Sequence, residues 1–292
     1  MRHHAVSLLS LTLLSFGVWQ QRLVHGPAGV LASLCLLAFH GGATLGFGLA
    51  WGQGAIPFAK LLLPHAPIAL AFAAHAFAVC AGESSPQPAP WQLLGLPVTL
   101  APALFRAAEA VAPSLLASLR SGDAFAWLGL TTIPGSTVAT LAGGLFLTHA
   151  LLEIGLGALK LRGRYAHEPP LDAPGGRGAR GAMYVRHHGC ALIALGALGL
   201  GLWADPFLHL AGGGRRYPAG LFFAPPGLDL LLSPFGLLAV ACLLLLHVGA
   251  VGVFAHAWVS GAIPLKKVLL PHGPFALGFA VLALWQWAQH SN

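Results

Sequence analysis

Charged side chains are scarce in this sequence of 292 residues, which has 15 lysines and arginines and only 8 aspartates and glutamates. Charged residues make up 8% of the chain and hydrophobic residues 57%, and the mean hydropathy is +0.76. A soluble domain normally carries about 25% charged residues. This shortage argues against a soluble fold of this size, and we expect an all-α, polytopic transmembrane helix bundle in contact with the lipid bilayer.

Catalytic and nucleotide-binding motifs are also missing. The chain has no HExxH, no Walker-type loop, no GxSxG and none of the dense histidine clusters of membrane di-iron enzymes. Its four cysteines form no CxxC or other metal-ligand spacing, so a disulfide framework is not expected. The formal net charge is +7, but the basic residues lie in short loops between apolar runs, where the positive-inside rule explains them. A hydrolase, a nucleotide-driven pump and a nucleic-acid partner are therefore not expected.

One stretch of the chain is present twice. Residues 51–73 and 258–280 are identical at 15 of 23 aligned positions, which marks an internal duplication. The Arg-His-His triplet at 2–4, which opens an apolar run, recurs at 186–188. Because the second triplet is internal, we interpret the first apolar run as a membrane span and not as a cleaved signal peptide.

Seven apolar runs are predicted to cross the hydrocarbon core, which takes roughly 20 helical residues. Three spans in each half correspond to one another, so we expect two parallel three-helix repeats joined by a connector helix and related by a pseudo-twofold axis along the membrane normal. The predicted spans are 4–23, 28–50, 58–81, 136–160, 187–206, 235–257 and 267–288. The predicted domains are repeat one at 1–81, an extracytoplasmic linker with an interfacial helix at 82–135, the connector span at 136–160, a basic cytoplasmic linker at 161–182 and repeat two at 183–292.

The distribution of lysine and arginine predicts the orientation. Ten of these residues fall on the side of the N-terminus and five on the opposite side, which places the N-terminus in the cytoplasm and the C-terminus outside it. A bacterial inner membrane is the expected location. A further pair of short spans within 91–131 is compatible with the sequence and leaves the orientation of the second repeat unchanged.

Fifteen histidines are an unusual number for so apolar a chain, and several fall inside predicted spans. His40 and His247 occupy equivalent positions near the middle of the second span of each repeat, and the predicted axis places them at equal depth. Two facing imidazoles suit the axial ligation of one haem b. Neutral histidines that hydrogen-bond between helices are the structural alternative. The other histidines near span ends, including those at 3–4 and 187–188, are interpreted as interfacial.

The connector span carries His149 and Glu153, which lie on one helical face at i and i+4. An acid within a span is a functional candidate, and one hypothesis is a proton relay. A second is a transition-metal site formed by His40, His149 and His247, with or without Glu153. A protonated glutamate that hydrogen-bonds His149 is the structural alternative.

The duplicated stretch places Lys60 with His65 and Lys267 with His272 at proline-rich beginnings of the third and seventh spans. A quinone carbonyl, a haem propionate or a lipid phosphate would fit such a basic corner. The structural alternative is that both lysines anchor the helix ends at the membrane surface.

Three functional hypotheses follow. The first is a membrane subunit of an electron-transfer complex that binds haem b or interacts with quinone, with other membrane subunits as partners. The second is a transporter or channel for a small solute, a proton or a metal ion, and the third is a non-catalytic structural subunit of a larger assembly. Whether the protein is an enzyme is left open by the sequence.

Overall fold

The computed structural model describes seven segments of the chain, and all regular secondary structure within them is helical, which confirms the all-α prediction. The described residues are 2–20, 27–62, 65–80, 133–162, 177–208, 228–270 and 272–291. The helices are α1 (Arg2–Gln20), α2 (Pro27–Gly52), α3 (Phe58–Leu62), α4 (His65–Cys80), α8 (Gly135–Leu161), α9 (Arg177–Leu208), α10 (Leu228–Leu231), α11 (Pro234–Val259), α12 (Leu265–Leu269) and α13 (His272–Ser291).

Among the described residues, five helical segments are long and apolar enough to cross a membrane, which is compatible with an integral membrane protein. They are Ala28–Gly52, Phe58–Val79, Gly135–Leu161, Gly181–Ala204 and Pro234–Val259. The first and last of the seven predicted spans do form helices, α1 and α13, but neither is among these five. Both carry polar residues, including histidines at the end where each begins, and these lower the apolar character of the segment.

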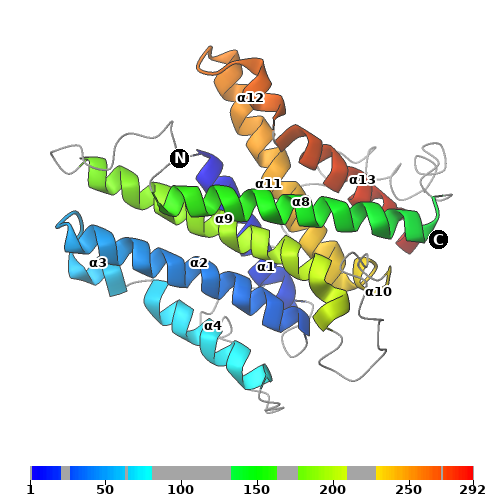
Figure 1. Ribbon diagram of the computed structural model, residues 1–292, viewed down its shortest axis with the longest axis horizontal. Helices are drawn as coiled ribbons and strands as arrows, with labels where there is room; N and C mark the ends of the chain where they lie inside the picture. Colours follow the sequence, from blue (N-terminus) through cyan, green and yellow to red (C-terminus); the bar gives the residue numbers. More distant parts are fainter. Residues whose placement is uncertain are drawn as a thin grey trace.

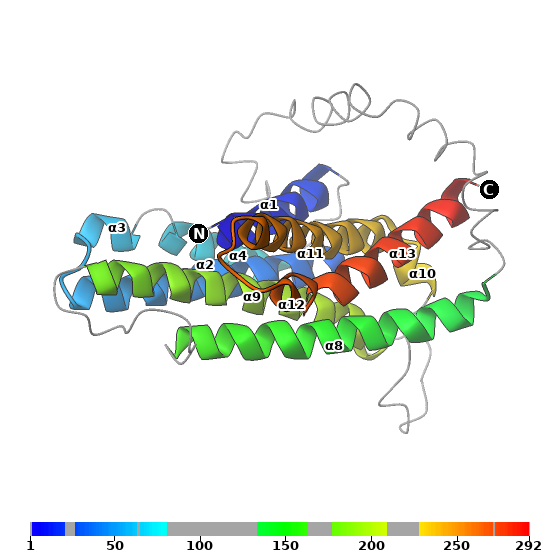
Figure 2. The same cartoon turned by 90° about the horizontal axis from the view of Figure 1, so that it is seen from above.

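Helices from distant parts of the sequence pack in two similar groups. α1 packs along α11, and α9 packs along α2, so the first helix of each half lies against the second helix of the other half. α2 also packs against α4, and α11 against α13. Figure 1 shows α9 between α8 and α2, and Figure 2 shows α1 beside α11.

Glycines bring α8 and α9 into close contact. A Cβ atom added at Gly189 would lie 2.8 Å from the carbonyl oxygen of Gly157, and one added at Gly157 would lie 2.6 Å from the oxygen of Gly189. At Gly196 the added atom would lie 2.8 Å from the side chain of Ile154. Small residues of this kind let helix backbones approach in apolar surroundings, where packing drives association.

The duplicated stretch forms the same turn in both halves. Gly54 and Gly261 both have positive φ, 68° and 73°, a conformation that favours glycine. Each donates its backbone N–H at 2.8 Å to the carbonyl of a tryptophan three residues earlier, Trp51 or Trp258. These turns end α2 and α11 and return the chain towards α4 and α13, where two of the candidate histidines lie.

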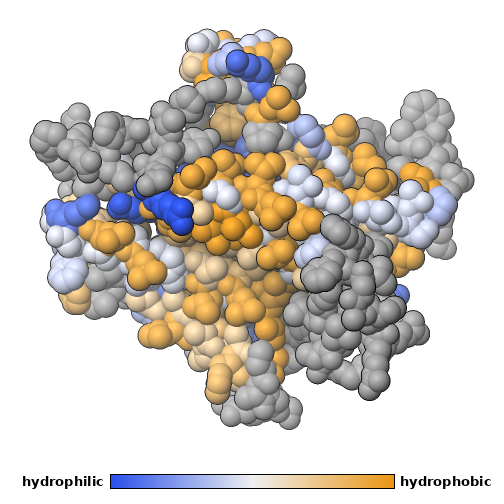
Figure 3. Space-filling view, viewed as in Figure 1, coloured by the Kyte–Doolittle hydropathy of each residue, from blue (hydrophilic) through white to orange (hydrophobic). Residues whose placement is uncertain are grey.

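Large apolar side chains cover much of the surface. Leu45, Phe77 and Val259 are 74%, 73% and 77% exposed, and orange apolar residues extend over the face seen in Figure 3. Exposure of this extent is the reverse of what a soluble protein shows. It suits contact with lipid tails.

Several predictions of domain organisation fall outside the described residues. The predicted interfacial helix and the possible short spans within 91–131 belong to residues 81–132, of which the structure describes nothing. The predicted basic linker at 161–182 is described only at its ends, and α9 already begins at Arg177. Three cysteines, Cys35, Cys190 and Cys242, are free and buried, as expected for thiols that act as small apolar groups.

Replacing Gly189 by alanine should weaken the α8–α9 contact, because the added methyl group meets a backbone carbonyl that has little room to move. Overpacking of this kind costs about 1–3 kcal/mol. Gly155→Ala is the matched control, since nothing lies within 4 Å of a Cβ at that position of α8. Thermal unfolding of the detergent-purified variants should show a lower midpoint for Gly189→Ala only. Equal midpoints would contradict the proposed role of the close contact.

Candidate functional site

Nine histidines form one continuous group inside the helix bundle, which we call the histidine array. Each ring centroid lies 4.7–5.5 Å from the next. The array connects both halves of the chain and the α8 helix between them. In order of contact its members are His40, His65, His187, His4, His188, His3, His272, His247 and His149.

The same pair of imidazoles occurs in each half. Nδ1 of His40 lies 2.9 Å from Nδ1 of His65, and Nδ1 of His247 lies 3.0 Å from Nδ1 of His272. The ring planes make angles of 40° and 42° in the two pairs. In both cases a histidine from the middle of the second helix meets one that begins the third-span helix. His65 and His272 from the duplicated stretch thus contact the mid-span histidines His40 and His247.

Histidines from α1 and α9 join these two pairs. His187 contacts His65, and His3 contacts His272, each with a centroid distance of 4.9 Å. Nε2 of His4 lies 2.9 Å from Nδ1 of His187. These contacts follow from the packing of α1 on α11 and of α9 on α2.

The histidines of the second Arg-His-His triplet, which the sequence analysis interpreted as interfacial, lie in the interior of the helix bundle. His187 and His188 are only 9% and 8% exposed, and both are members of the array. The physical reason is that α9 already begins at Arg177, so this triplet lies within a helix that packs against α2, and its imidazoles face the interior. The recurrence of the triplet in the sequence was a signal that could have identified these residues.

Several array nitrogens have no hydrogen-bond partner within the described parts of the chain. Nε2 of His3, Nδ1 of His4, and Nε2 of His187 and His188 are buried and make no hydrogen bond to any described residue. Buried polar atoms are nearly always paired, with protein, water or an ion. Four such atoms lie in the middle of the array.

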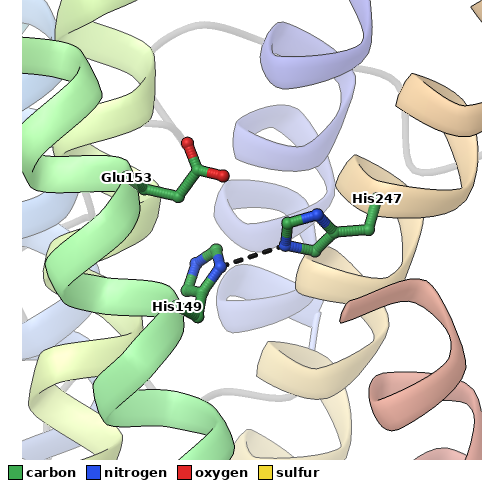
Figure 4. A group of neighbouring side chains, drawn as sticks. All are labelled: His149, Glu153 and His247. Carbon is green, nitrogen blue, oxygen red and sulfur yellow. Dashed lines mark hydrogen bonds between the residues drawn. The ribbon is translucent and has the colours of Figure 1, made fainter. Parts of the chain in front are cut away.

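A compact group of possible metal ligands lies at one end of the array. His149, Glu153 and His247 each offer one ligand atom, and these atoms all lie within 4.8 Å of one another. The three residues are 0%, 2% and 0% exposed. Figure 4 shows His149 and Glu153 projecting from α8 towards His247 on α11. The sequence had placed His40 in this group, but His40 lies at the other end of the array and contacts His65.

Hydrogen bonds set the tautomers of the neutral imidazoles near this group. A carbonyl oxygen only accepts, so Nε2 of His149, 3.3 Å from the oxygen of Leu195, carries the proton. Nδ1 of His149 therefore accepts from Nε2 of His247, at 3.0 Å. Nδ1 of His247 then accepts from Nδ1 of His272. One backbone carbonyl thus orders three consecutive rings, and this ordered set of donors also suits the predicted proton relay.

Glu153 lies beside this chain of imidazoles. Its Oε2 atom is buried and has no hydrogen-bond partner among the described residues. Lys160 lies two turns further along the same face of α8, is 7% exposed and interacts electrostatically with Glu153. A carboxyl group buried in this position is either protonated or paired with a positive charge, and either the lysine or a bound cation can supply that charge.

Aromatic and small residues shape the walls of the site. Phe275 and Phe279 stack on the ring of His247, with centroid distances of 4.9 and 5.6 Å. A Cβ atom added at Gly199 would lie 2.9 Å from the ring of His149, so glycine at this position of α9 leaves room for the imidazole. The site is therefore enclosed and apolar apart from its ligand atoms.

The two lysines of the predicted basic corner are not part of the array. Lys60 is exposed, and Lys267 lies in α12, where its side chain is not described. His65 and His272, their predicted partners, are instead buried in the array. The exposed position of Lys60 suits the structural alternative of an anchor at the membrane surface.

Comparison of the chain with family models, with curated proteins and with solved structures gives no match. The fold and the site alone define the class. The described chain is an all-helical protein compatible with an integral membrane protein, with an array of nine imidazoles in its interior.

The order of hydrogen bonds predicts that neutral His149 carries its proton on Nε2. Nitrogen-15 NMR of protein labelled at histidine should show this tautomer for the resonance that disappears in His149→Ala. The variant should leave the His40–His65 signals in place, because that pair lies at the other end of the array. A resonance of the Nδ1–H tautomer for His149 would contradict the assignment.

Proposed function

We propose that this protein is an integral membrane protein that binds transition-metal ions in the histidine array and carries them across the bilayer. The observation that carries this proposal is the continuity of the array, in which nine imidazoles join both halves of an apolar helix bundle. Ionisable and polar groups within a membrane mark ion pathways more often than they mark simple packing.

The chemistry of the ligands favours a transition metal as substrate. Imidazole suits zinc, copper, iron and nickel, whereas calcium and magnesium require sets of oxygen ligands. Within the described segments, the array contains nine imidazoles and one neighbouring carboxylate, Glu153. Along the proposed path, the nitrogens of His187, His4, His188 and His3 that lack a partner among the described residues are available as metal ligands.

The arrangement of the two halves supports a route along their interface. Seven spans in two parallel repeats around a connector, with the N-terminus in the cytoplasm, would place the array near a pseudo-twofold axis. The matching His40–His65 and His247–His272 pairs and the equivalent packing of α9 on α2 and α1 on α11 support this arrangement.

Electron transfer through haem b, the first hypothesis from the sequence, has less support from the geometry. One haem between His40 and His247 needs a ring nitrogen of each to face the same iron. Each instead bonds a second histidine, and six other imidazoles connect the two in the array. The repeated pairs do favour a metal-binding role, which a transporter and an electron-transfer subunit share.

Purified protein in proteoliposomes should admit Zn²⁺, reported by an indicator trapped inside. The double variant His187→Ala/His188→Ala should lose most of this uptake, because it removes two central members of the array. His256→Ala is the matched control, since His256 is exposed near the end of α11 and should leave uptake unchanged. Uptake no faster than in protein-free vesicles, or equal in the double variant and the wild type, would show that the array does not carry the metal.

An absorption spectrum of the same preparation distinguishes haem binding from metal transport. We expect no Soret band in the purified, reduced protein. A Soret band that is lost in His40→Ala or His247→Ala would favour haem ligation and electron transfer over metal transport.

A further inference from the structure

We infer that His149, Glu153 and His247 form one high-affinity site for a divalent transition-metal ion at one end of the histidine array. This inference deepens the proposed function, on which it rests for the class of metal. It assigns to α8 a specific task, because α8 supplies two of the three ligands and has no counterpart in the other half.

The spacing of the nitrogen atoms fits a shared metal ion. Nδ1 of His149 and Nε2 of His247 are 3.0 Å apart. Two nitrogens on one tetrahedral Zn²⁺ lie roughly 3.4 Å apart when each bond is about 2.05 Å. A shift of a few tenths of an ångström therefore converts this hydrogen-bonded pair into two ligands, and the third ligand atom, from Glu153, is already within 4.8 Å.

The unpaired oxygen of Glu153 is an independent sign of a cation. The residue is 2% exposed, and its Oε2 atom has no hydrogen-bond partner in the described parts of the chain. A buried carboxylate oxygen without a partner is costly. A divalent cation between the carboxylate and the two imidazoles would satisfy it and would bring positive charge to this buried carboxylate.

The ring nitrogens of His149 and His247 that would not bind the metal have the hydrogen-bond partners that metal-binding histidines require. A ligating imidazole normally donates its other N–H to a carbonyl, a carboxylate or another acceptor, which fixes the ring. Nε2 of His149 donates to the oxygen of Leu195. Nδ1 of His247 lies 3.0 Å from Nδ1 of His272, and with metal on Nε2 of His247 it becomes the donor of that bond.

The other half of the molecule provides an internal comparison. His40 and His65 form the same Nδ1–Nδ1 contact as His247 and His272. His187 contacts His65 there, but among the described residues the group on α8 and α11 is the one whose ligand atoms satisfy the spacing of a metal site. The sequence duplication thus produced two imidazole pairs, and the connector helix completes a site at one of them.

The ligand set indicates the class of metal. Two imidazoles and one carboxylate occur in catalytic zinc sites and in the facial triad of non-haem Fe²⁺ proteins. Both sets leave at least one coordination position open. An open position beside His247, on whose ring Phe275 and Phe279 stack, would be available to a water molecule or to a neighbouring group during transfer.

Lys160 provides the competing explanation for Glu153. It lies on the same face of α8 and interacts electrostatically with the carboxyl group. If the lysine is the sole counter-charge of Glu153, neutralising the carboxylate should not affect metal binding. Glu153→Gln therefore separates the two explanations, and it keeps the size of the side chain and the packing of α8.

The full-length protein, purified in detergent and treated with chelator, should bind one Co²⁺ per chain with the visible absorption bands of a tetrahedral site. Zn²⁺ should displace it, and X-ray absorption of the Zn²⁺ form should show nitrogen and oxygen ligands without sulfur. Loss of a group that hydrogen-bonds a metal ligand typically weakens metal binding ~10- to 100-fold. We expect a loss of about that size for His272→Ala, which removes the hydrogen-bond partner of His247. Glu153→Gln and His149→Ala each remove a ligand and should weaken Co²⁺ binding by at least as much.

Matched controls come from the other half. His40→Ala and His65→Ala remove the residues aligned with His247 and His272, and both should keep the Co²⁺ spectrum and its affinity. The inference is overturned if the wild type binds no Co²⁺, if Glu153→Gln binds as tightly as the wild type, or if His40→Ala weakens binding as much as His149→Ala. Loss of Zn²⁺ uptake with intact Co²⁺ binding would contradict the transport proposal but keep this site.

Discussion

An imidazole buried among apolar side chains must find a partner for each of its nitrogens, and this requirement organises the interior of the protein. The histidines meet it in part by contacting one another, and four buried nitrogens of the array have no partner among the described residues. Four N···N contacts of 2.9–3.0 Å and a series of ring contacts link helices that are otherwise held together by apolar packing. Where the array ends, the carbonyl of Leu195 accepts the last proton and thereby sets the tautomer of His149 and of the rings behind it.

The apolar scaffold keeps these contacts in place through close helix packing. Glycines at the α8–α9 contact let the two backbones approach, and Gly199 leaves the space into which His149 projects. The duplicated turns after α2 and α11 direct the chain back so that His65 and His272 face the mid-span histidines. Packing and polar contacts therefore depend on each other, because neither alone would align nine rings.

The histidine array contains a similar imidazole pair in each half of the chain, but α8 adds further ligands at one end only. The duplicated pairs supply similar imidazole sites in both halves, and the triplets from α1 and α9 connect them. Only one end receives His149 and Glu153 from α8. We propose that metal is held most tightly there, and the rest of the array provides weaker, all-nitrogen positions. A difference in metal affinity between the two ends of the array would give those ends different roles in transport.

The sequence by itself determined the class of the protein, because the shortage of charge and the length of the apolar runs leave an all-α membrane bundle as the expected fold. The alignment of the duplicated halves matched His40 with His247, and helical spacing put His149 and Glu153 on one face of α8. Only the tertiary structure decided that α1 packs on α11 and α9 on α2, that His187 and His188 of the second Arg-His-His triplet are buried, and that His40 lies apart from His149. The reason is physical: periodicity records which face of a helix is apolar, whereas the partner of that face depends on packing between residues far apart in the chain.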